Sequence, residues 1–436
     1  MKKTKRIGWK GCLMALVLMV LPATVHAWSE DILSHFQVYI TAEEEYNSNI
    51  DSAPNRLKKD DFITTISPGL RFSTSEFRRP PTEEDRFRLD LDFRPGFVFY
   101  AKEHEDNYIS LDGSLNARYA FTRNLTFRVR DYLIRDDETR EQDYSATALP
   151  GQYLLSRTSI RTPYFRNVFE PSLEYRFGRE NLIALNFRNN IYEINSRVFE
   201  GSMENYINPR LTYWFNIKHG LNLEYGLTLG HFEDSPDLVG HRAMGRYTYR
   251  FNPRTSIFCE YTYERNDFDP PSIDYDVHRP TLGLEYKFSP TLTGTAQAGY
   301  FWQIPEEGSR TTGPSFNLSL TKTAERTTYS LSFQGGYTED YFTAENRGFT
   351  KTYTGYGTIS HQLTEKLTVG VTGSMGRAIY SNDQKDWIWV ISGNASYALL
   401  RWLSLSLQVE HNGDNSNISN SDYTQYRGIF RITATY

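Results

Sequence analysis

The stretch 86–100, RFRLDLDFRPGFVFY, is the feature that most constrains what this chain can fold into. Apolar residues fill its odd-numbered positions from Phe87 to Phe99, whereas charge fills the even-numbered positions Arg88, Asp90, Asp92 and Arg94. Alternate side chains of a strand point to opposite faces, so this strand has one apolar and one charged face. A soluble sandwich would show the same pattern in one strand. A membrane barrel requires the pattern to repeat along the whole chain.

The pattern does repeat, and it predicts about 20 strands, or 18 if one hairpin is miscounted. The expected strands are 36–47, 61–74, 86–100, 108–121, 125–135, 164–177, 182–194, 205–215, 221–232, 241–251, 256–265, 275–288, 292–302, 314–323, 327–338, 349–361, 367–380, 387–399, 403–410 and 423–436. Long apolar runs that could pack a core between two sheets are too few. A secreted all-β protein is therefore the weaker interpretation.

The segments between these strands alternate between tight and long. Tight turns include 178–181 and 289–291, and longer polar segments include 266–274 and 411–422; the segment 75–85 is long where a tight turn is due. Short periplasmic turns alternating with longer outer loops are typical of outer-membrane barrels, as are aromatic girdles, and 15% of this chain is aromatic. The sequence predicts an all-β, antiparallel, up-and-down transmembrane barrel with both ends in the periplasm.

Residues 1–27 have the features of a signal peptide: a basic start, an apolar stretch and the small-x-small ending Val25-His26-Ala27. The barrel would then occupy 28–436, in which Cys259 is the only cysteine, so no internal disulfide can form. No apolar run after residue 27 is long enough for a membrane helix. Together with the strands, these features predict the outer membrane of a Gram-negative bacterium.

The chain ends inside its last strand on an aromatic residue, Tyr436. Such an ending resembles the signal read by the outer-membrane assembly machinery, which we expect as a partner, along with outer-membrane lipid and lipopolysaccharide. The net charge of −5 and the absence of a basic patch argue against nucleic acid as a partner.

The segment Tyr46-Asn47-Ser48-Asn49-Ile50 resembles the opening signature of the putative β-barrel porin 2 family, with Asn47 where aspartate is usual. The segments 62–72 and 86–92 are similar to that family's second and third strands. Members include outer-membrane proteins encoded with exopolysaccharide synthesis genes. The resemblance implies a channel for saccharide or small polar solutes, with the terminal step of exopolysaccharide export as its sharper form. A periplasmic polysaccharide-export protein would then be a partner.

Strand parity predicts a lumen with two unlike walls. Serine, threonine, asparagine and glutamine fill the inward positions between 293 and 408, whereas charged groups fill the inward positions of the earlier strands. The arginines could bind carboxylate or phosphate groups of a solute. Alternatively, they could pair with carboxylates of neighbouring strands and only brace the barrel. The predicted charged lumen residues are Arg88, Asp90, Asp92, Arg94, Arg118, Arg128, Arg130, Arg166, Arg188 and Arg210.

The longest segment without strand pattern, 136–163, is expected to fold into the pore opposite the arginines. Its carboxylates would create a transverse field across a constriction; they include Asp136, Asp137, Glu138 and Glu141. A solvated surface loop is the alternative.

Two other functions remain open, a structural or adhesive barrel with a blocked lumen and an outer-membrane enzyme. His231 with Glu233 and Asp234 is the nearest catalytic candidate, but no partnering nucleophile accompanies it. The other histidines lack metal-ligand spacing, and no phosphate-binding loop occurs. We therefore expect no enzyme activity, no cofactor and no metal.

Overall fold

The structure, a computed structural model, describes residues 34–75, 86–137, 162–196, 199–342, 346–418 and 421–436. The predicted signal peptide, 1–27, lies outside this part of the chain. The strands are β1 (Phe36–Asn47), β2 (Asp61–Ser73), β3 (Phe87–Tyr100), β4 (Tyr108–Ala120), β5 (Leu125–Asp136), β6 (Tyr164–Phe177), β7 (Asn181–Ile194), β8 (Ser202–Trp214), β9 (His219–Phe232), β10 (Leu238–Asn252), β11 (Thr255–Phe268), β12 (Tyr275–Ser289), β13 (Leu292–Pro305), β14 (Thr311–Thr323), β15 (Thr327–Asp340), β16 (Gly348–Gln362), β17 (Leu367–Tyr380), β18 (Lys385–Leu400), β19 (Leu403–Ser416) and β20 (Tyr423–Thr435).

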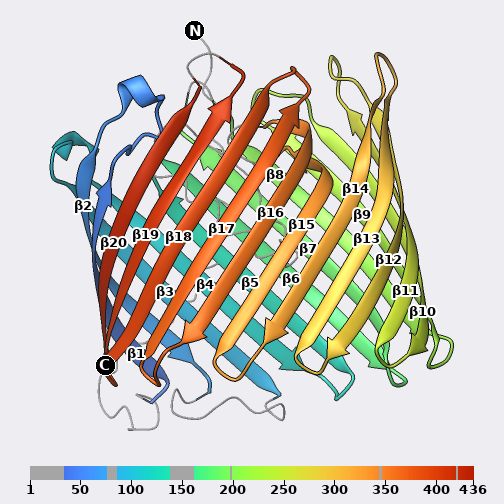
Figure 1. Ribbon diagram of the computed structural model, residues 1–436, viewed down its shortest axis with the longest axis horizontal. Helices are drawn as coiled ribbons and strands as arrows, with labels where there is room; N and C mark the ends of the chain where they lie inside the picture. The colour runs from blue at the N-terminus through green and yellow to red at the C-terminus, as the bar shows by residue number, and fades with distance from the viewer. Residues whose placement is uncertain (1–33, 76–85, 138–161, 197–198, 343–345, 419–420) are drawn as a thin grey trace, which may run out of the picture.

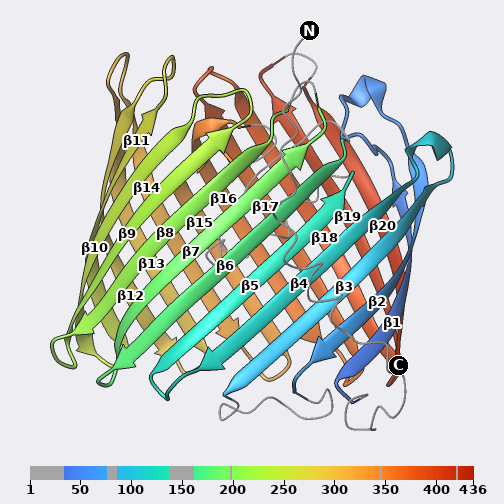
Figure 2. The ribbon, with the colours of Figure 1, turned by 180° about the vertical axis from the view of Figure 1, so that it is seen from behind.

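Each strand pairs antiparallel with the next, and β1 pairs with β20 to close a 20-stranded barrel (Figures 1 and 2). Every predicted segment overlaps one of these strands, so the predicted fold class and the count of 20 are confirmed. Tyr39 near the start of β1 lies opposite Thr435 at the end of β20, which puts both ends of the sheet at the same rim. We call this rim, at the bottom of Figure 1, the lower rim. That the lower rim faces the periplasm remains a prediction.

The outer face of the barrel is apolar, with an aromatic band near the lower rim. A Tyr-x-Phe pair recurs at the lower ends of alternate strands: Tyr119/Phe121, Tyr175/Phe177, Tyr213/Phe215, Tyr249/Phe251 and Tyr286/Phe288. Exposed aliphatic side chains such as Leu223 and Leu331 lie above it. Outer-membrane barrels carry such a lipid-facing belt between aromatic girdles. This surface, exposed in isolation, is therefore the one that contacts lipid.

Buried apolar side chains gather on the inner face instead. They form three small clusters: Ile50, Ile63, Val98 and Tyr100; Ile134, Tyr164 and Tyr192; Tyr275, Val277, Phe301 and Phe349. A barrel this wide has more interior than its own strand side chains fill. The third cluster shows what fills part of it, because Phe349 of β16 packs there against residues of β12 and β13, which are not its neighbours in the wall.

Candidate functional site

Several arginines of the predicted charged wall, and Arg71 of β2 beside it, are held by carboxylates of the same or a neighbouring strand. The shortest contacts of these pairs are Arg71–Asp92 (2.8 Å), Arg88–Asp90 (2.6 Å), Arg94–Asp112 (2.7 Å), Arg128–Glu174 (2.6 Å), Arg130–Glu170 (3.0 Å) and Arg188–Glu204 (2.6 Å). Five of the six join different strands, as the bracing interpretation expects. Bracing does not exclude solute binding, because each guanidinium has more donors than one carboxylate uses.

In all of these pairs the arginine is the more exposed partner. The Arg130 side chain is 54% exposed and that of Glu170 is 8% exposed. Arg246 and Glu260, on β10 and β11, repeat the arrangement with 27% and 6%. In the pairs of β5 to β8 and of β10 with β11, the carboxylates therefore lie against the wall and the arginines form more of the exposed surface. In the pairs of β2 to β4 the two partners are more equally exposed.

The remaining predicted lumen residues lie in the same wall. Arg118 on β4 is directly opposite Arg88 on β3 and Arg128 on β5, so three arginines follow one another across the sheet. Arg166 donates from Nε to Oδ1 of Asn190 (3.1 Å), and Arg210 lies opposite Glu224 in the β8–β9 register.

The predicted constriction loop is only partly described. Asp136 ends β5, is buried and accepts a hydrogen bond from the Tyr108 hydroxyl (2.5 Å), and Asp137 follows it. Glu138 and Glu141 lie outside the described residues, and the transverse field stays a prediction.

Opposite the arginines, β13 to β19 present the neutral wall. Hydroxyl and amide side chains there contact one another across strands, as Thr358 and Thr372 do (3.2 Å between hydroxyl oxygens). Gln297 donates to the Thr281 hydroxyl (2.9 Å). Hydroxyl and amide groups can exchange hydrogen bonds with polar solutes as readily as with each other.

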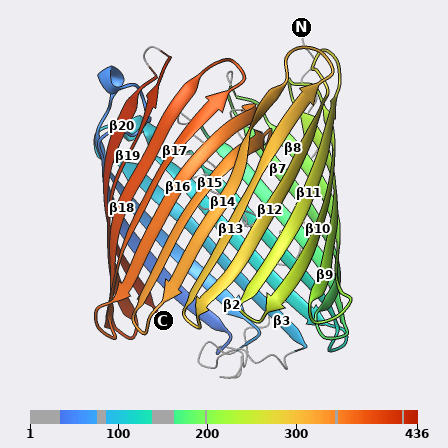
Figure 3. The ribbon, with the colours of Figure 1, turned by 45° about the vertical axis from the view of Figure 1, so that its right-hand side comes forward.

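The upper end of the neutral wall departs from a simple cylinder. The ladder between β14 and β15 runs from Thr323 and Thr328 only to Phe316 and Gly335, although both strands continue upward. Above Gly335, β15 pairs with β16 alone among the strands. Figure 3 brings this part of the wall forward. We call residues 336–342 and 346–352 the flap.

The flap lies against the inner face of β11, β12 and β13. Tyr337 of β15 packs on Phe301 of β13 (5.1 Å between ring centroids) and stacks on Phe349 of β16 (5.0 Å). Phe301 is fully buried by this contact, and Phe342 stacks on Phe232 of β9 (5.4 Å). The sheet thus overlaps itself, with one layer of the barrel wall folded inside another.

Polar groups fasten the flap to the same strands. The Tyr337 hydroxyl donates to Oε2 of Glu264 (2.5 Å), and Glu339 accepts hydrogen bonds at Oε1 from Asn266 Nδ2 (2.9 Å) and the Tyr275 hydroxyl (2.7 Å). The partners are 64 to 73 residues apart in sequence. A buried hydrogen bond contributes about 0.5–1.5 kcal/mol, and one to a charged group about 1.5–3 kcal/mol.

The far edge of the flap reaches across the upper rim to the connection that precedes β8 and the one between β9 and β10. Asn346 donates from Nδ2 to Oε1 of Glu200 (2.8 Å), whose carboxylate also accepts from the backbone N–H groups of Asp234 and Ser235 and from the Ser235 hydroxyl. Burial raises the pKa of Glu200, but these hydrogen bonds outweigh it and hold the pKa below its ordinary value. Glu200 is therefore ionised at neutral pH and acts as a latch for the flap.

Sequence reasoning missed the flap because infolding leaves the side-chain alternation unchanged. Phe333 and Tyr337 point away from the barrel axis, but Phe333 meets lipid whereas Tyr337 meets the inner wall. One signal was present: the odd positions change from Leu331 and Phe333 to tyrosine and glutamate above the Gly335-Gly336 pair.

Other candidate sites carry less. His231 contacts the carboxylate of Asp237 (2.9 Å), rather than Glu233 or Asp234 with which the sequence grouped it. Across the described ranges, no three or more His, Cys, Asp or Glu residues are placed to hold a metal ion. No helix in the described part of the chain is both long and apolar enough to cross a membrane.

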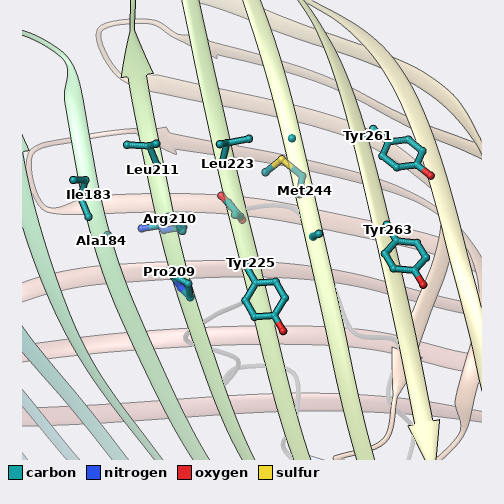
Figure 4. A pocket seen from close by; sticks show the side chains of 13 residues that line it. Ile183, Ala184, Pro209, Arg210, Leu211, Leu223, Tyr225, Met244, Tyr261 and Tyr263 are labelled. Atoms are coloured by element: carbon teal, nitrogen blue, oxygen red, sulfur yellow. The ribbon is translucent and has the colours of Figure 1, made fainter.

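A groove crosses β7 to β11, with Leu211, Leu223, Tyr225 and Tyr261 along its sides (Figure 4). It forms where Ala243 and Gly245 leave space between these larger side chains on the outer face. Its lining is overwhelmingly apolar, as expected where lipid contacts the wall.

The motif 46–50 lies where the barrel closes. Asn47 accepts hydrogen bonds at Oδ1 from the Asn49 backbone N–H (2.9 Å) and from Gln425 Nε2 (3.0 Å), and Gln425 also donates to the Asn49 carbonyl (2.7 Å). Gln425 belongs to β20, so these amides join the first strand to the last. The motif therefore stabilises the closing seam.

The comparison with protein families confirms the expected resemblance over the second half of the chain. The model of the family described as putative beta-barrel porin 2 matches residues 233–436, which excludes the motif 46–50. A comparison with curated proteins finds no match.

Two receptors of known structure share the fold at low sequence identity, and a third protein matches at a lower TM-score. The siderophore receptor PirA from Pseudomonas aeruginosa is 9% identical with a TM-score of 0.50, over 92% of this chain and 80% of that one. The ferric enterobactin receptor PfeA is 10% identical with a TM-score of 0.51, over 92% and 81%. OccK3 (OpdO) from Pseudomonas aeruginosa is 12% identical with a TM-score of 0.45, over 93% and 97%. This chain is therefore an outer-membrane β-barrel with a porin-like fold.

Proposed function

We propose that this barrel is a channel for saccharide or other small polar solutes, and that anionic saccharides pass best. The supporting observation is the guanidinium surface of the lumen, formed because each carboxylate is more buried than its arginine. Arginine binds carboxylate and phosphate groups in a planar, two-pronged geometry. The hydroxyl and amide wall of β13 to β19 supplies partners for sugar hydroxyl groups.

The sharper form of the proposal is the terminal outer-membrane step of exopolysaccharide export. Export would require a periplasmic polysaccharide-export protein at the lower rim, where the turns are short. Lipopolysaccharide around the outer face and assembly through the strand that ends in Tyr436 belong to the same proposal. The direction of transport follows from the partner and not from the lumen itself.

Conductance of the purified barrel in planar lipid bilayers tests the channel. We expect anion preference in a salt gradient, because fixed positive charge in a narrow pore favours anions. An anionic oligosaccharide should block the current at lower concentration than a neutral one of equal length.

Arg128→Gln with Arg130→Gln should shift the reversal potential toward cations. Arg326→Gln, in the exposed turn between β14 and β15 at the lower rim, is the matched control and should leave the preference unchanged. A folded barrel without any conductance would favour the structural barrel with a blocked lumen. An ion preference that ignores both lumen substitutions would contradict the role given to the arginines.

A further inference from the structure

The flap leaves a vacant edge in the wall of the barrel. Residues 311–315 of β14 pair with β13, and within the described part of the chain no strand continues the β15 ladder beside them. Unpaired backbone groups are costly where the wall meets lipid, and exposed strand edges attract new partners. Tyr353 of β16 stacks against Phe316 (6.3 Å between centroids) at the foot of this gap.

The flap fits that edge in length and register. The last observed pair is Phe316 with Gly335. If the antiparallel register continued, Ser315 would lie opposite Gly336 and Thr311 opposite Asp340. These are the last residues of β14 and β15 at the upper rim, so the two strands would end together.

Pro314 is placed as an edge residue. Elsewhere in the barrel, a strand proline pairs with the neighbouring strand on one side only. This holds for Pro171, Pro209 and Pro280, which are missing from the ladder on the side that their nitrogen faces, because a proline nitrogen carries no hydrogen to donate. Pro314 stays in the β13 ladder opposite Tyr300, which directs its nitrogen to the vacant side. While the flap is folded in, the vacant edge therefore has no unsatisfied N–H group at position 314.

A line of glycines crosses the sheet where the flap bends. Gly335 and Gly336 lie on β15, Gly355 and Gly357 on β16, and Gly376 on β17 opposite Thr354. Glycine in a strand marks bends and close approaches of the backbone. At Gly335 the requirement is direct, because a Cβ there would lie 2.4 Å from the Phe316 ring. The bend is therefore localised and does not break the pairing of β15 with β16 or β16 with β17.

The side chains of the flap suit both positions. Folded in, Tyr337 and Glu339 contact β11 to β13. Paired with β14, Tyr337 would lie opposite Pro314, level with Tyr300 and Trp302 in an aromatic pair on the outer face (5.1 Å between centroids). Tyrosine is favoured at membrane interfaces, and Glu339 would lie two residues higher on the same face, toward water.

We propose that the flap is a gate that exchanges partners: folded onto β11 to β13 it narrows the pore, and paired with the β14 edge it completes the cylinder and widens the pore. This proposal rests on the proposed channel function and adds its regulation. The latch on Glu200 stabilises the narrow state, because its hydrogen bond to Asn346 holds the edge of the flap against the other side of the upper rim. The described structure is the narrow state.

Two disulfide locks test the gate, both in a Cys259→Ser background because Cys259 is exposed. Ser235→Cys with Asn346→Cys, bridged by a short bifunctional methanethiosulfonate reagent that forms a reducible disulfide with each cysteine, locks the flap in, since the two native side chains are in contact (3.4 Å between Nδ2 of Asn346 and Oγ of Ser235). Thr311→Cys with Asp340→Cys locks it out, since these residues become direct neighbours only in the widened register. The four single-cysteine variants are the controls for the substitutions themselves.

We expect the first lock to lower conductance and the second to raise it, with reductant reversing both. The gate is overturned if the second disulfide does not form in folded barrels under oxidation, or if the first leaves conductance unchanged. Absence of conductance even in barrels carrying the second lock would refute the channel function itself. Conductance that neither lock changes would refute the gate alone.

Discussion

Removal of the Tyr337 hydroxyl should shift the flap toward its widened state. In the folded-in state this hydroxyl donates to the Glu264 carboxylate (2.5 Å), while the ring packs on Phe301 and Phe349. Tyr337→Phe keeps the ring contacts and loses only this hydrogen bond. A buried hydrogen bond to a charged group contributes about 1.5–3 kcal/mol. Because about 1.4 kcal/mol changes an equilibrium constant tenfold, the ratio of widened to narrow barrels should rise roughly 10- to 150-fold.

Single-channel recording measures this ratio as the fraction of time in the higher-conductance level. The matched control is Tyr329→Phe, on the same strand, whose side chain is exposed on the outer face near the lower rim. Glu264→Gln should reproduce part of the effect, and the double variant should be less than additive because the two groups share one interaction. An unchanged level distribution in a folded Tyr337→Phe barrel would refute the assignment of the flap as the moving element.

Three further predictions follow from the same geometry. Hydrogen bonds hold the pKa of Glu200 below its ordinary value, so the Glu200 latch is complete above about pH 4.3, the ordinary pKa of glutamate, and is lost as the pH falls through the lower pKa of the folded protein. Acidification should therefore increase the population of the widened level. Glu200→Gln should abolish this pH dependence. Cysteines at Asn415 and Pro290, in the Cys259→Ser background, should report the orientation: an impermeant thiol reagent on whole cells should reach only Asn415, and the reverse labelling would invert the barrel. Phe93→Arg, on the lipid face at the middle of β3, should cost roughly 2–4 kcal/mol, and Thr372→Arg in the lumen far less. Equal loss of the heat-modifiable folded barrel in both variants would contradict the assignment of the two faces.

The alternation of side chains was sufficient to determine the barrel. A lipid-facing or core-facing residue is selected one position at a time, so the period of two survives in sequence without any tertiary information. The bounds of β6 and β17, 164–177 and 367–380, agree with prediction at both ends. Errors occur mainly at the upper ends, as in β19, where Leu403–Ser416 extends beyond the predicted end at residue 410. Polar residues there face water on both sides, and the alternation fades.

The sequence also predicted which arginines face the lumen, but not what they do there. Arg128 pairs with Glu174 and Arg130 with Glu170, and these partners depend on the register of β5 against β6. That the arginine is the more exposed member of each pair depends on how far each side chain reaches from the wall. Neither property is local in sequence, so charge counting alone could not separate bracing from solute binding.

The infolding of β15 and β16 was decided only by the tertiary structure. An outward-pointing side chain needs a nonpolar or well-paired environment, and alternation is the same whether lipid or another strand supplies it. Tyr337 and Glu339 obtain theirs from β11 and β12, at sequence separations of 64 to 73 residues. The strand pattern therefore specifies that a barrel wall forms and which of its faces is apolar. Only long-range packing specifies where that wall folds into its own lumen.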